Sequence, residues 1–389
     1  MKLLHTSDWH IGKTLKGRNR LDEQRKVIGQ IIDVARKHQP DAVLIAGDLY
    51  DVSAPSADAQ KLVVQALLAL AKTGAQVIAI AGNHDSAATF DAYRPLMDAA
   101  GITMVGLVRT AENGGAVSFN ARSTGERVNV AVLPFLSQRY AVRAAQLIAS
   151  TPAEMSRDYD DMVREVLANL AESFTPDAVN IVTAHLTVTG GAFGGGERAA
   201  QSIFEYHVPA TAFPAETHYV ALGHLHRRQT LPAACPVVYS GSPFAVDFGE
   251  QNNIHVVCLV EATPTTPAKI TDIPITAGRR LRTVHGTVAE ILARAEDFGD
   301  DFLRVYVREP TSAGLRETIT DALPNALEVR IDPEFAIAVN TARPTINHAD
   351  RSPGELFAEY CDSIGVVDDR VRALFAELHD RITSTGTRG

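Results

Sequence analysis

Five short polar clusters in the sequence are rich in side chains that bind divalent metal ions. Each contains a carboxylate, an amide oxygen or an imidazole nitrogen. In chain order they are Asp8-Trp9-His10, Gly47-Asp48, Gly82-Asn83-His84-Asp85, His185 and Gly223-His224-Leu225-His226. Two divalent metals held about 3.5–4 Å apart activate a water molecule and bind a phosphoryl oxygen. The chemistry that such a set of ligands favours is therefore phosphoester hydrolysis.

Asp48 is the natural ligand to share between two metals. It is the only carboxylate in its cluster, and a carboxylate offers about four lone-pair sites. The glycine before it allows a tight turn and a close backbone approach. The other candidate ligands are Asp8, His10, Asn83, His185, His224 and His226. This mixture of oxygen and nitrogen ligands suits manganese, magnesium, iron or zinc and does not choose among them.

His84 directly follows the candidate ligand Asn83 and is the candidate catalytic acid. As an imidazolium it can protonate the leaving oxygen or stabilise the transferring phosphate. The next residue, Asp85, is expected to fix the tautomer of His84 and to raise its pKa. Both residues are therefore predicted to be catalytic.

A strand-like apolar run precedes each cluster. The runs are Lys2–Thr6, Ala42–Ala46, Gln76–Ala81, Val179–Ala184 and Tyr219–Leu222. Between them, Leu21–Lys37 and Ala57–Lys72 have apolar residues at helical spacing, so the pattern predicts an α/β fold with a mostly parallel sheet. Ligands of such sheets bind just beyond the carboxyl ends of the strands. Residues more than 200 positions apart can therefore meet in one pocket.

The clusters carry more information together than separately. A Gly-Asp or Gly-Asn pair at a strand end is usually a turn, and His185 alone is typical of a hydrogen-bonded, half-buried histidine. The pair His224 and His226 is stronger, because two neighbouring imidazoles repel each other when both are charged. It is the ordered set of five clusters, each at a strand end, that favours a metal centre.

Several other polar residues are expected to be structural. His5 and His218 lie within strand-like runs, and Trp9 is expected to pack beneath the site. Asp51 either orients a ligand or a water, or belongs to a turn. The remaining histidines lie outside every cluster: His38, His207, His255, His285, His348 and His379.

The second half of the chain changes in composition. Residues 111–260 are rich in predicted strands, with one helix at about Tyr159–Ala171 and a Gly-rich surface loop beside the pocket at Gly190–Gly196. Pro264 and Pro267 then give residues 261–269 the composition of a linker. We expect three parts: 1–262 with the metal centre, a small α+β domain at 270–340, and a helical segment at 352–389 that follows a polar stretch at 344–354.

The bulk properties are those of an ordinary globular protein. Of 389 residues, 46% are apolar and 21% charged. The net charge of −9 argues against nucleic-acid binding through a broad basic surface, although two divalent metals would add four positive charges locally. Three scattered cysteines favour neither a disulfide framework nor a thiolate zinc site. Without a signal peptide or membrane span in the sequence, the cytoplasm is the expected compartment.

The order of the five clusters resembles the signature of the calcineurin-like metallophosphoesterases. Within that superfamily the chain most resembles the SbcD family of bacterial nuclease subunits. The resemblance rests on Leu4-His5-Thr6-Ser7-Asp8-Trp9-His10-Ile11-Gly12, Ala46-Gly47-Asp48-Leu49-Tyr50-Asp51, Ile80-Ala81-Gly82-Asn83-His84-Asp85 and Tyr239-Ser240-Gly241-Ser242-Pro243. It covers about the first 250 residues, whereas the later small domain is similar only in length, position and element pattern.

The resemblance implies a site and a fold. The fold would be a two-sheet sandwich flanked by helices (α-β-β-α), with a small α+β capping domain and C-terminal helices. One metal would be held by Asp8, His10, Asp48 and His226, and the second by Asp48, Asn83, His185 and His224. His84 would be the catalytic acid. Mn²⁺ is the usual activator of the family, and Mg²⁺ is the other possibility.

The resemblance also implies a biological role. The chain would be a Mn-dependent DNA nuclease subunit in break processing and repair, with double-strand exonuclease and single-strand or hairpin endonuclease activity. It would form a homodimer through helices near the N-terminal half and dock its last helices onto an SbcC-type coiled-coil ABC ATPase. The apolar stripe Val367, Val371, Leu374 and Leu378 fits such docking and fits packing on its own domain equally well. Archaeal relatives have a histidine where this chain has Asp51, which puts any exonuclease role of that position in doubt.

Two other functions remain open at this stage. The first is a phosphoesterase of the same fold that acts on a small molecule or a phosphoprotein, which would need neither a capping domain nor docking helices. The second is a non-catalytic assembly protein that metals only stabilise. The presence of His84 beside a complete ligand set argues against the second.

Overall fold

The computed structural model describes residues 1–136, 159–197, 207–336, 352–363 and 369–385 of the chain. It divides into two units, Met1–Arg330 and Ile331–Gly389, which are described separately. The first unit holds all five polar clusters. It consists of two six-stranded sheets, their covering helices and a small three-stranded domain.

The first sheet has the strand order β16-β15-β1-β4-β5-β6. Its parallel part consists of β1 (Lys2–Thr6), β4 (Ala42–Ile45), β5 (Gln76–Ile80) and β6 (Ile102–Val105). Strands β15 (Val256–Thr263) and β16 (Thr266–Pro274) join β1 in antiparallel register. The parallel strands β1, β4 and β5 bring the first three polar clusters to one edge.

The second sheet has the strand order β13-β14-β12-β9-β8-β7. Strands β8 (Arg127–Leu133), β9 (Val179–His185), β12 (Tyr219–Gly223) and β14 (Val237–Tyr239) are parallel. Strands β7 (Ala116–Asn120) and β13 (Gln229–Leu231) close its two sides in antiparallel register. The last two polar clusters follow β9 and β12.

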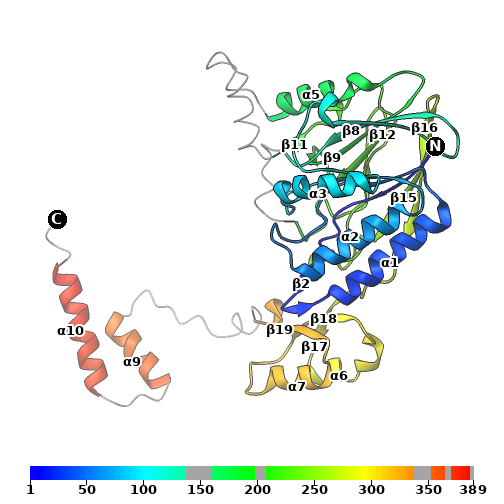
Figure 1. Ribbon diagram of the computed structural model, residues 1–389. Helices are drawn as coiled ribbons and strands as arrows, with labels where there is room; N and C mark the ends of the chain where they lie inside the picture. Colours follow the sequence, from blue (N-terminus) through cyan, green and yellow to red (C-terminus); the bar gives the residue numbers. More distant parts are fainter. Residues whose placement is uncertain (137–158, 198–206, 337–351, 364–368, 386–389) are drawn as a thin grey trace. The chain divides into compact units, whose positions relative to one another are not determined.

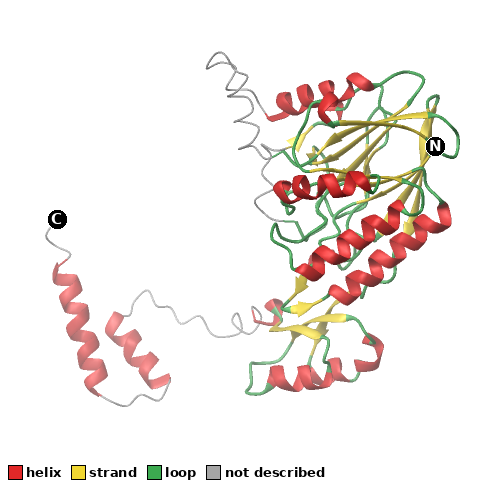
Figure 2. Cartoon of the chain, in the orientation of Figure 1, coloured by secondary structure: helices red, strands yellow, loops and turns green. Residues whose placement is uncertain are grey.

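The sheets pack face to face and helices cover their outer faces (Figure 1). Helices α1 (Leu21–His38), α2 (Ala57–Ala71) and α3 (Ala87–Ala99) lie on the first sheet, and α5 (Tyr159–Leu170) lies on the second. The core between the sheets includes Leu44, Ile80, Val130 and Ile181, all buried. This arrangement confirms the predicted α-β-β-α sandwich (Figure 2).

The helix α1 forms where the sequence predicts it because its apolar residues recur at helical spacing. Val27, Ile31 and Ala35 on this stripe are fully buried against the first sheet. Burying a valine or isoleucine side chain contributes roughly 1.5–3 kcal/mol, so the stripe ties the helix to the sheet. Helix α2 begins after Ser56, whose hydroxyl accepts the backbone N–H of Ala59.

The predicted linker at residues 261–269 is wrong. These residues form the hairpin between β15 and β16, with Glu261 paired to Lys269. Pro264 lies in the turn, and Pro267 lies in an edge strand, where the missing N–H costs little. The part of the chain that belongs to the first sheet therefore extends to Pro274, beyond the expected boundary at 262.

The small domain consists of the sheet β17-β18-β19 and two short helices. Its strands are β17 (Leu281–Gly286), β18 (Phe302–Val307) and β19 (Ala326–Ile331), and its helices are α6 (Val288–Leu292) and α7 (Leu315–Ala322). Phe302 packs with Leu15 and Phe248 of the two-sheet part, and Lys16 pairs with Glu328 at 3.1 Å. These contacts attach the domain near β2 (Thr14–Leu15) and β3 (Arg18–Asn19).

The described residues of the second unit include helices α9 (Pro353–Ser363) and α10 (Asp369–Thr385). The rings of Phe357 and Phe375 stack at 4.0 Å between their centroids and hold the pair together. Most of the predicted polar stretch at 344–354, and the end of the predicted small domain at 337–340, lie outside the described residues. Among the helices that the structure describes, none has the length and apolar composition to cross a membrane.

The described residues also include shorter elements that the sequence patterns do not predict. They are β10 (Thr187–Val188), β11 (His207–Val208) and the 3₁₀ turns η1 (Ala111–Asn113), η3 (Ala171–Ser173), η6 (Ala210–Ala212), η7 (Phe248–Glu250) and η8 (Ala295–Phe298). The last of these, η8, follows helix α6 in the small domain. The turn η7 lies between the small domain and the metal-binding edge.

Candidate metal centre

The candidate ligands lie at the carboxyl ends of strands β1, β4, β5, β9 and β12. Four of them have a left-handed backbone: Asp8 (φ 54°), His10 (φ 43°), Asp48 (φ 52°) and His224 (φ 99°). This conformation is uncommon for residues other than glycine, and such residues cluster at functional sites. The chain therefore accepts backbone strain at the edge where it gathers metal-binding side chains.

Two glycines allow the strand ends to approach each other closely. A Cβ atom on Gly82 would lie 2.2 Å from Oδ1 of Asp48, and one on Gly223 would lie 1.9 Å from the carbonyl oxygen of Ala46. Neither position can take a larger residue without moving a neighbouring strand end. These glycines thus bring the clusters after β5 and β12 against the cluster after β4.

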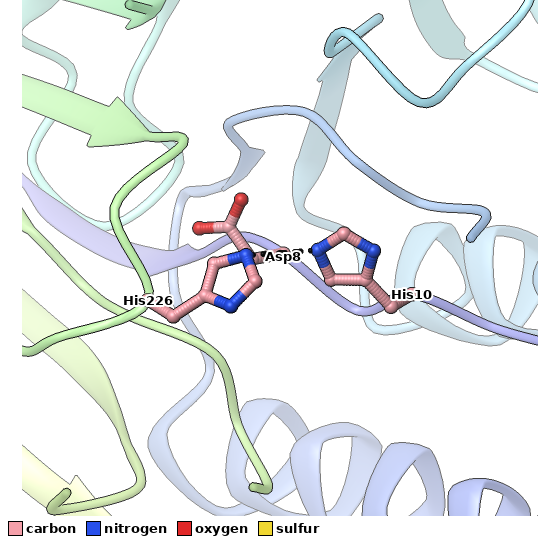
Figure 3. A group of neighbouring side chains, drawn as sticks. All are labelled: Asp8, His10 and His226. Carbon is pink, nitrogen blue, oxygen red and sulfur yellow. Dashed lines mark hydrogen bonds between the residues drawn. The ribbon is translucent and has the colours of Figure 1, made fainter. Parts of the chain in front are cut away.

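The first half of the centre consists of Asp8, His10 and His226. Ligand atoms of these buried residues lie within 4.8 Å of one another. Figure 3 shows the three side chains converging from two distant segments of the chain. The Nε2 atoms of His10 and His226 are 3.0 Å apart, which is the arrangement of two imidazoles that can share a cation.

The second half is arranged around Asn83. Its Oδ1 lies 2.9 Å from Nε2 of His185 and 2.9 Å from Nδ1 of His224. Asp8, Asp48 and His185 form a further group with ligand atoms within 4.8 Å. His224 lies outside the carboxylate-containing groups, although its backbone N–H donates to Oδ1 of Asp8 at 3.0 Å.

The polar atoms of this edge fit a bound cation. Nδ1 of His185 lies 2.8 Å from the carbonyl of Ala46, which only accepts, so Nδ1 donates and the neutral ring has its lone pair at Nε2. In that neutral form the lone pair faces another acceptor, Oδ1 of Asn83. Nδ1 of His10 and Nδ2 of Asn83 are buried without a hydrogen-bond partner among the described residues. Acceptors that face each other, beside a buried ring nitrogen of this kind, match the set of donor atoms that a divalent cation binds.

The electrostatics of the edge also favour a cation. Burial lowers the pKa of His185, but the charge of Asp48 outweighs it and raises the pKa to about 9. Burial likewise opposes the effect of Glu250 on His226, whose pKa is raised to about 10. The carboxylates thus hold positive charge on two imidazoles, and divalent cations would supply that charge in place of the protons.

The two aspartates respond differently to their surroundings. Burial raises the pKa of Asp8 above its ordinary value. Burial has the same effect on Asp48, but the charge of His185 and a hydrogen bond from it hold the pKa of Asp48 well below its usual range. His224 has a pKa well below its ordinary value because of burial and the nearby charge of His185, so its imidazole is neutral and able to bind a metal.

His84 lies next to this centre, with ligand atoms of His10, Asp48 and His84 within 4.8 Å of one another. Its Nδ1 lies 2.6 Å from the backbone carbonyl of Asp51. That carbonyl accepts a hydrogen from Nδ1, and this contact fixes the ring tautomer. The side chain of Asp51 also pairs with Lys13 at 3.1 Å. Asp51 therefore contacts His84 through its backbone and Lys13 through its side chain.

The role predicted for Asp85 needs correction. Its carboxylate accepts the backbone N–H groups of Leu49, Tyr50 and Gly82, at 2.9–3.1 Å. Asp85 therefore joins the turns after β4 and β5, while the tautomer of His84 is fixed at Nδ1 by Asp51. The adjacent position in the sequence suggested a contact with the ring of His84, whereas both carboxylate oxygens of Asp85 accept backbone N–H groups.

Two acidic residues that the sequence patterns do not single out support the ligand His226. Oε1 of Glu250 lies 2.5 Å from its Nδ1, and Oε1 of Glu197 accepts its backbone N–H at 2.8 Å. Glu197 follows the predicted loop Gly190–Gly196, which lies beside the centre as expected. Glu250 lies shortly after the segment Tyr239-Ser240-Gly241-Ser242-Pro243, which resembles the family. This proximity is the one signal in the sequence that could have indicated Glu250.

Comparisons with known proteins show which family the chain is similar to. The family model of the calcineurin-like phosphoesterases matches residues 1–228, and that of the "Type 5 capsule protein repressor C-terminal domain" matches residues 277–364. The SbcD subunit of the SbcCD nuclease from Bacillus subtilis is 36% identical over 285 residues, which cover 72% of this chain and 71% of the relative. The SbcD subunits of Rhodobacter capsulatus and Escherichia coli are 29% and 28% identical and cover 88% and 77% of this chain, and 89% and 74% of their own lengths.

Proposed function

The chain belongs to the calcineurin-like phosphoesterase family and to its SbcD nuclease subunits, and we propose that it hydrolyses DNA phosphodiester bonds with two Mn²⁺ ions. The observation that carries the proposal is the position of Asp48. Its Oδ2 lies 3.4 Å from Nε2 of His185 and 3.8 Å from Nε2 of His10. One carboxylate oxygen therefore faces imidazoles of both halves of the centre, which is where a shared ligand must lie.

The proposed ligands divide between two positions that share Asp48. The first ion is held by Asp8, His10, Asp48 and His226, and the second by Asp48, Asn83, His185 and His224. Mn²⁺ suits this mixture, because it accepts carboxylate and amide oxygens as well as imidazoles, whereas Mg²⁺ prefers oxygen ligands and retains several waters. Mg²⁺ is therefore the weaker candidate.

Two bound divalent ions supply a nucleophile at neutral pH and neutralise charge on the phosphoryl oxygens. Residues of the chain supply the proton and hold the site in place. His84 donates a proton to the leaving oxygen, with its ring held at Nδ1 by the carbonyl of Asp51. Asp85 keeps the turns after β4 and β5 together, so His84 and the shared ligand Asp48 keep their spacing.

The proposed substrate is DNA, with the small domain acting as a cap on it. Several arginines of this domain have their guanidinium groups over aromatic rings, at 4.9–5.7 Å from the ring centroids: Arg279, Arg282, Arg294 and Arg304. Such cations supply phosphate contacts that the net charge of −9 does not provide over the whole surface. Double-strand exonuclease and single-strand or hairpin endonuclease activity in break repair belong to the same proposal.

The proposed protein partner is an SbcC-type coiled-coil ABC ATPase that binds helices α9 and α10. Stacking of Phe357 on Phe375 joins these helices, while Val371, Leu374 and Leu378 of the predicted stripe stay 38–56% exposed. Val367, the first residue of that stripe, lies outside the described residues. An exposed apolar stripe of this kind is suited to laying a helix against a coiled coil.

We also expect a homodimer that forms through helices of the N-terminal half. Leu96 on α3 is 69% exposed, which is unusual for a leucine in a helix that covers a sheet. Light scattering of the purified protein at two concentrations measures its mass. A Leu96→Glu variant that becomes monomeric supports an interface on α3, and a wild-type protein that is monomeric at both concentrations contradicts the dimer.

A gel assay of the purified chain tests the central proposal. The protein is incubated with linear and hairpin DNA in Mn²⁺ or Mg²⁺, with and without its ATPase partner. Cleavage in Mn²⁺ that disappears in Asp48→Ala supports a DNA nuclease. Intact DNA under every condition, or equal cleavage by wild type and variant, contradicts it.

A truncation separates nuclease function from general phosphoesterase function. Removal of the chain after about residue 345 deletes α9 and α10 but leaves every proposed ligand. We expect the truncated protein to hydrolyse a chromogenic phosphodiester like the full chain and to lose partner-dependent cleavage of long DNA. Partner-dependent cleavage that survives the truncation contradicts the docking role of these helices.

A further inference from the structure

The turn from Asp247 to Gln251 lies between the metal-binding edge and the small domain. It contains the 3₁₀ element η7 (Phe248–Glu250) and begins where the side chain of Asp247 accepts the backbone N–H of Gly249. Consecutive residues of this turn contact different neighbours. Glu250 contacts a proposed metal ligand, whereas Phe248 and Gln251 contact the small domain.

Glu250 is fully buried, and its carboxylate has two hydrogen-bonding neighbours in the described part of the chain. Its Oε1 lies 2.5 Å from Nδ1 of His226, and its Oε2 accepts the backbone N–H of Val246 at 2.9 Å. A carboxylate only accepts, so Nδ1 of His226 carries a hydrogen, and a cation bound at Nε2 would take the place of the second ring proton. That Nε2 lies 3.0 Å from Nε2 of His10, on the side where the first metal position is.

The proposed ligand His185 of the second metal position is supported differently. His185 donates from Nδ1 to the carbonyl of Ala46, a neutral group that belongs to strand-end backbone. His226 is instead oriented by a charged side chain, and carboxylate partners of metal-binding imidazoles fix the ring and increase its basicity. The orientation of His226 therefore depends on where the Phe248–Gln251 turn places one glutamate.

The small domain holds this turn on both sides of Glu250. The buried ring of Phe248 packs with Leu281 and Phe302, and the guanidinium of Arg304 lies 5.1 Å from its centroid. On the other side, Oε1 of Gln251 accepts both the backbone N–H and the hydroxyl of Thr283, each at 2.8 Å. A shift of strand β17 or β18 would therefore move the residues that flank Glu250.

We propose that Glu250 is a positioning residue for the metal ligand His226, and that the small domain sets its position through the Phe248–Gln251 turn. This inference rests on the proposed metal centre and adds a route by which the domain expected to contact DNA influences that centre. A change in the position of Glu250 should then affect metal binding at the first position, because His226 is proposed to bind there. The second position, with His185 held by backbone, is not affected by this route.

Calorimetric titration of the purified full-length protein with Mn²⁺ tests the role of Glu250. We expect Glu250→Ala and Glu250→Gln to weaken one of two binding events by about 10–100-fold, the usual cost of losing such a partner, while the other event is unchanged. The glutamine variant keeps the shape of the side chain, so it remains informative if the alanine variant fails to fold. Glu23→Gln is the matched control, because Glu23 is also buried and contacts the small domain through Arg279 but not His226.

The outcomes separate this inference from the function on which it rests. Wild-type protein that binds no Mn²⁺ and leaves DNA intact overturns the proposed function itself. Wild-type protein that binds two ions, with Glu250→Gln and Glu250→Ala binding them equally well, overturns only the positioning role. Equal weakening in the Glu23→Gln control also overturns it, since loss of any buried carboxylate would then have the same effect.

A second pair of variants tests the link to the small domain. Gln251→Ala removes the acceptor of two hydrogen bonds from Thr283, and we expect about a threefold to tenfold weaker first binding event. Lys16→Met removes a different contact between the same parts, the ion pair with Glu328, and should leave Mn²⁺ binding unchanged. Equal affinities in Gln251→Ala and Lys16→Met would overturn the route through the turn and leave the role of Glu250 in place.

Discussion

Two buried polar regions of the first unit contain the same kinds of residue but differ in how they are satisfied. Between the sheets, Nδ1 of His5 lies 2.9 Å from the hydroxyl of Tyr219, and its Nε2 lies 3.1 Å from the carbonyl of Leu222. At the carboxyl edge, Nδ1 of His10 makes no hydrogen bond in the part of the chain that the structure describes, with Oδ1 of Asp51 3.6 Å away, and its Nε2 faces another imidazole. Both rings are buried, so burial alone does not distinguish a structural histidine from a functional one.

The backbone makes the same distinction. His5 lies inside strand β1 with ordinary strand pairing, whereas His10 follows that strand with a left-handed φ of 43°. Unsatisfied polar atoms and backbone strain both cost free energy, so a fold retains them together only where something else compensates. The carboxyl edge is thus suited to a bound cation, whereas both ring nitrogens of His5 already have protein partners.

The largest effect is expected when the carboxylate that both metal positions are proposed to share is removed. We expect Asp48→Ala to lose Mn²⁺ binding at both positions and to lower DNA cleavage by at least about 10⁴-fold, because neither the nucleophile nor the phosphate is then held. Calorimetric titration and a gel assay measure the two effects.

Asp41→Asn is the matched control for Asp48→Ala. Asp41 is a buried carboxylate just before strand β4, and it accepts the backbone N–H groups of Lys2 and Ser123. Its replacement should lower the free energy of unfolding and leave metal binding and cleavage unchanged. If Asp41→Asn lost metal as Asp48→Ala does, the carboxyl edge would have no special role.

The next test separates catalysis from metal binding within the same edge. His84→Gln should retain Mn²⁺ binding and lower cleavage of DNA by about 10²–10⁴-fold, which is the usual contribution of a general acid. The titration and the gel assay again provide the measurements. Loss of bound metal in this variant would mean that His84 is a ligand.

The leaving group sharpens the test of His84. A p-nitrophenyl phosphodiester releases a weakly basic phenolate that needs no proton, so His84→Gln should hydrolyse it with a much smaller loss than it shows on DNA. Equal losses on both substrates would contradict proton donation and favour a role in phosphate binding instead.

The sequence predicts the ligands of the edge better than their supporting residues. Asp8, Asp48 and His185 each follow an apolar run, and the periodicity of those runs predicts the strands that bring them together. Glu250 follows no such run and contacts a residue 24 positions away through an irregular turn. Periodicity says nothing about such turns, because their conformation depends on the tertiary contacts around them.

The errors have local causes of the same kind. The prolines at 264 and 267 predict a linker, but the alternating pairing of β15 with β16 extends a sheet whose edge tolerates them. Asp85 follows His84 in the sequence, and yet its carboxylate is used by three backbone N–H groups. In both cases the composition is informative, but the hydrogen-bond partners come from distant segments that sequence patterns do not identify.

A third test compares the two regions through stability. Mn²⁺ that binds only the folded chain should raise the free energy of unfolding by about 2.7 kcal/mol at 100 times the dissociation constant. Thermal melts with Mn²⁺ and with EDTA measure this change. A variant at the other region, Tyr219→Phe, should show the same increase, whereas Asp48→Ala should show none. An equal melting temperature of the wild type in Mn²⁺ and EDTA would contradict a metal-completed edge.

The smallest expected effect concerns the region that needs no cation. Burial lowers the pKa of His5 to about 3, from 6.5 in the unfolded chain. Between these values the unfolded chain binds a proton that the folded chain does not, so stability decreases as the pH falls below about 6.5, by up to ~1.4 kcal/mol per pH unit. Denaturant unfolding at pH 5.5 and 6.5 in EDTA should show this slope in the wild type and a reduced slope in His5→Asn. Tyr219→Phe keeps the imidazole of His5 and should keep the slope. A slope that survives unchanged in His5→Asn would mean that His5 is charged within the fold. The two regions would then differ less than their hydrogen bonds indicate.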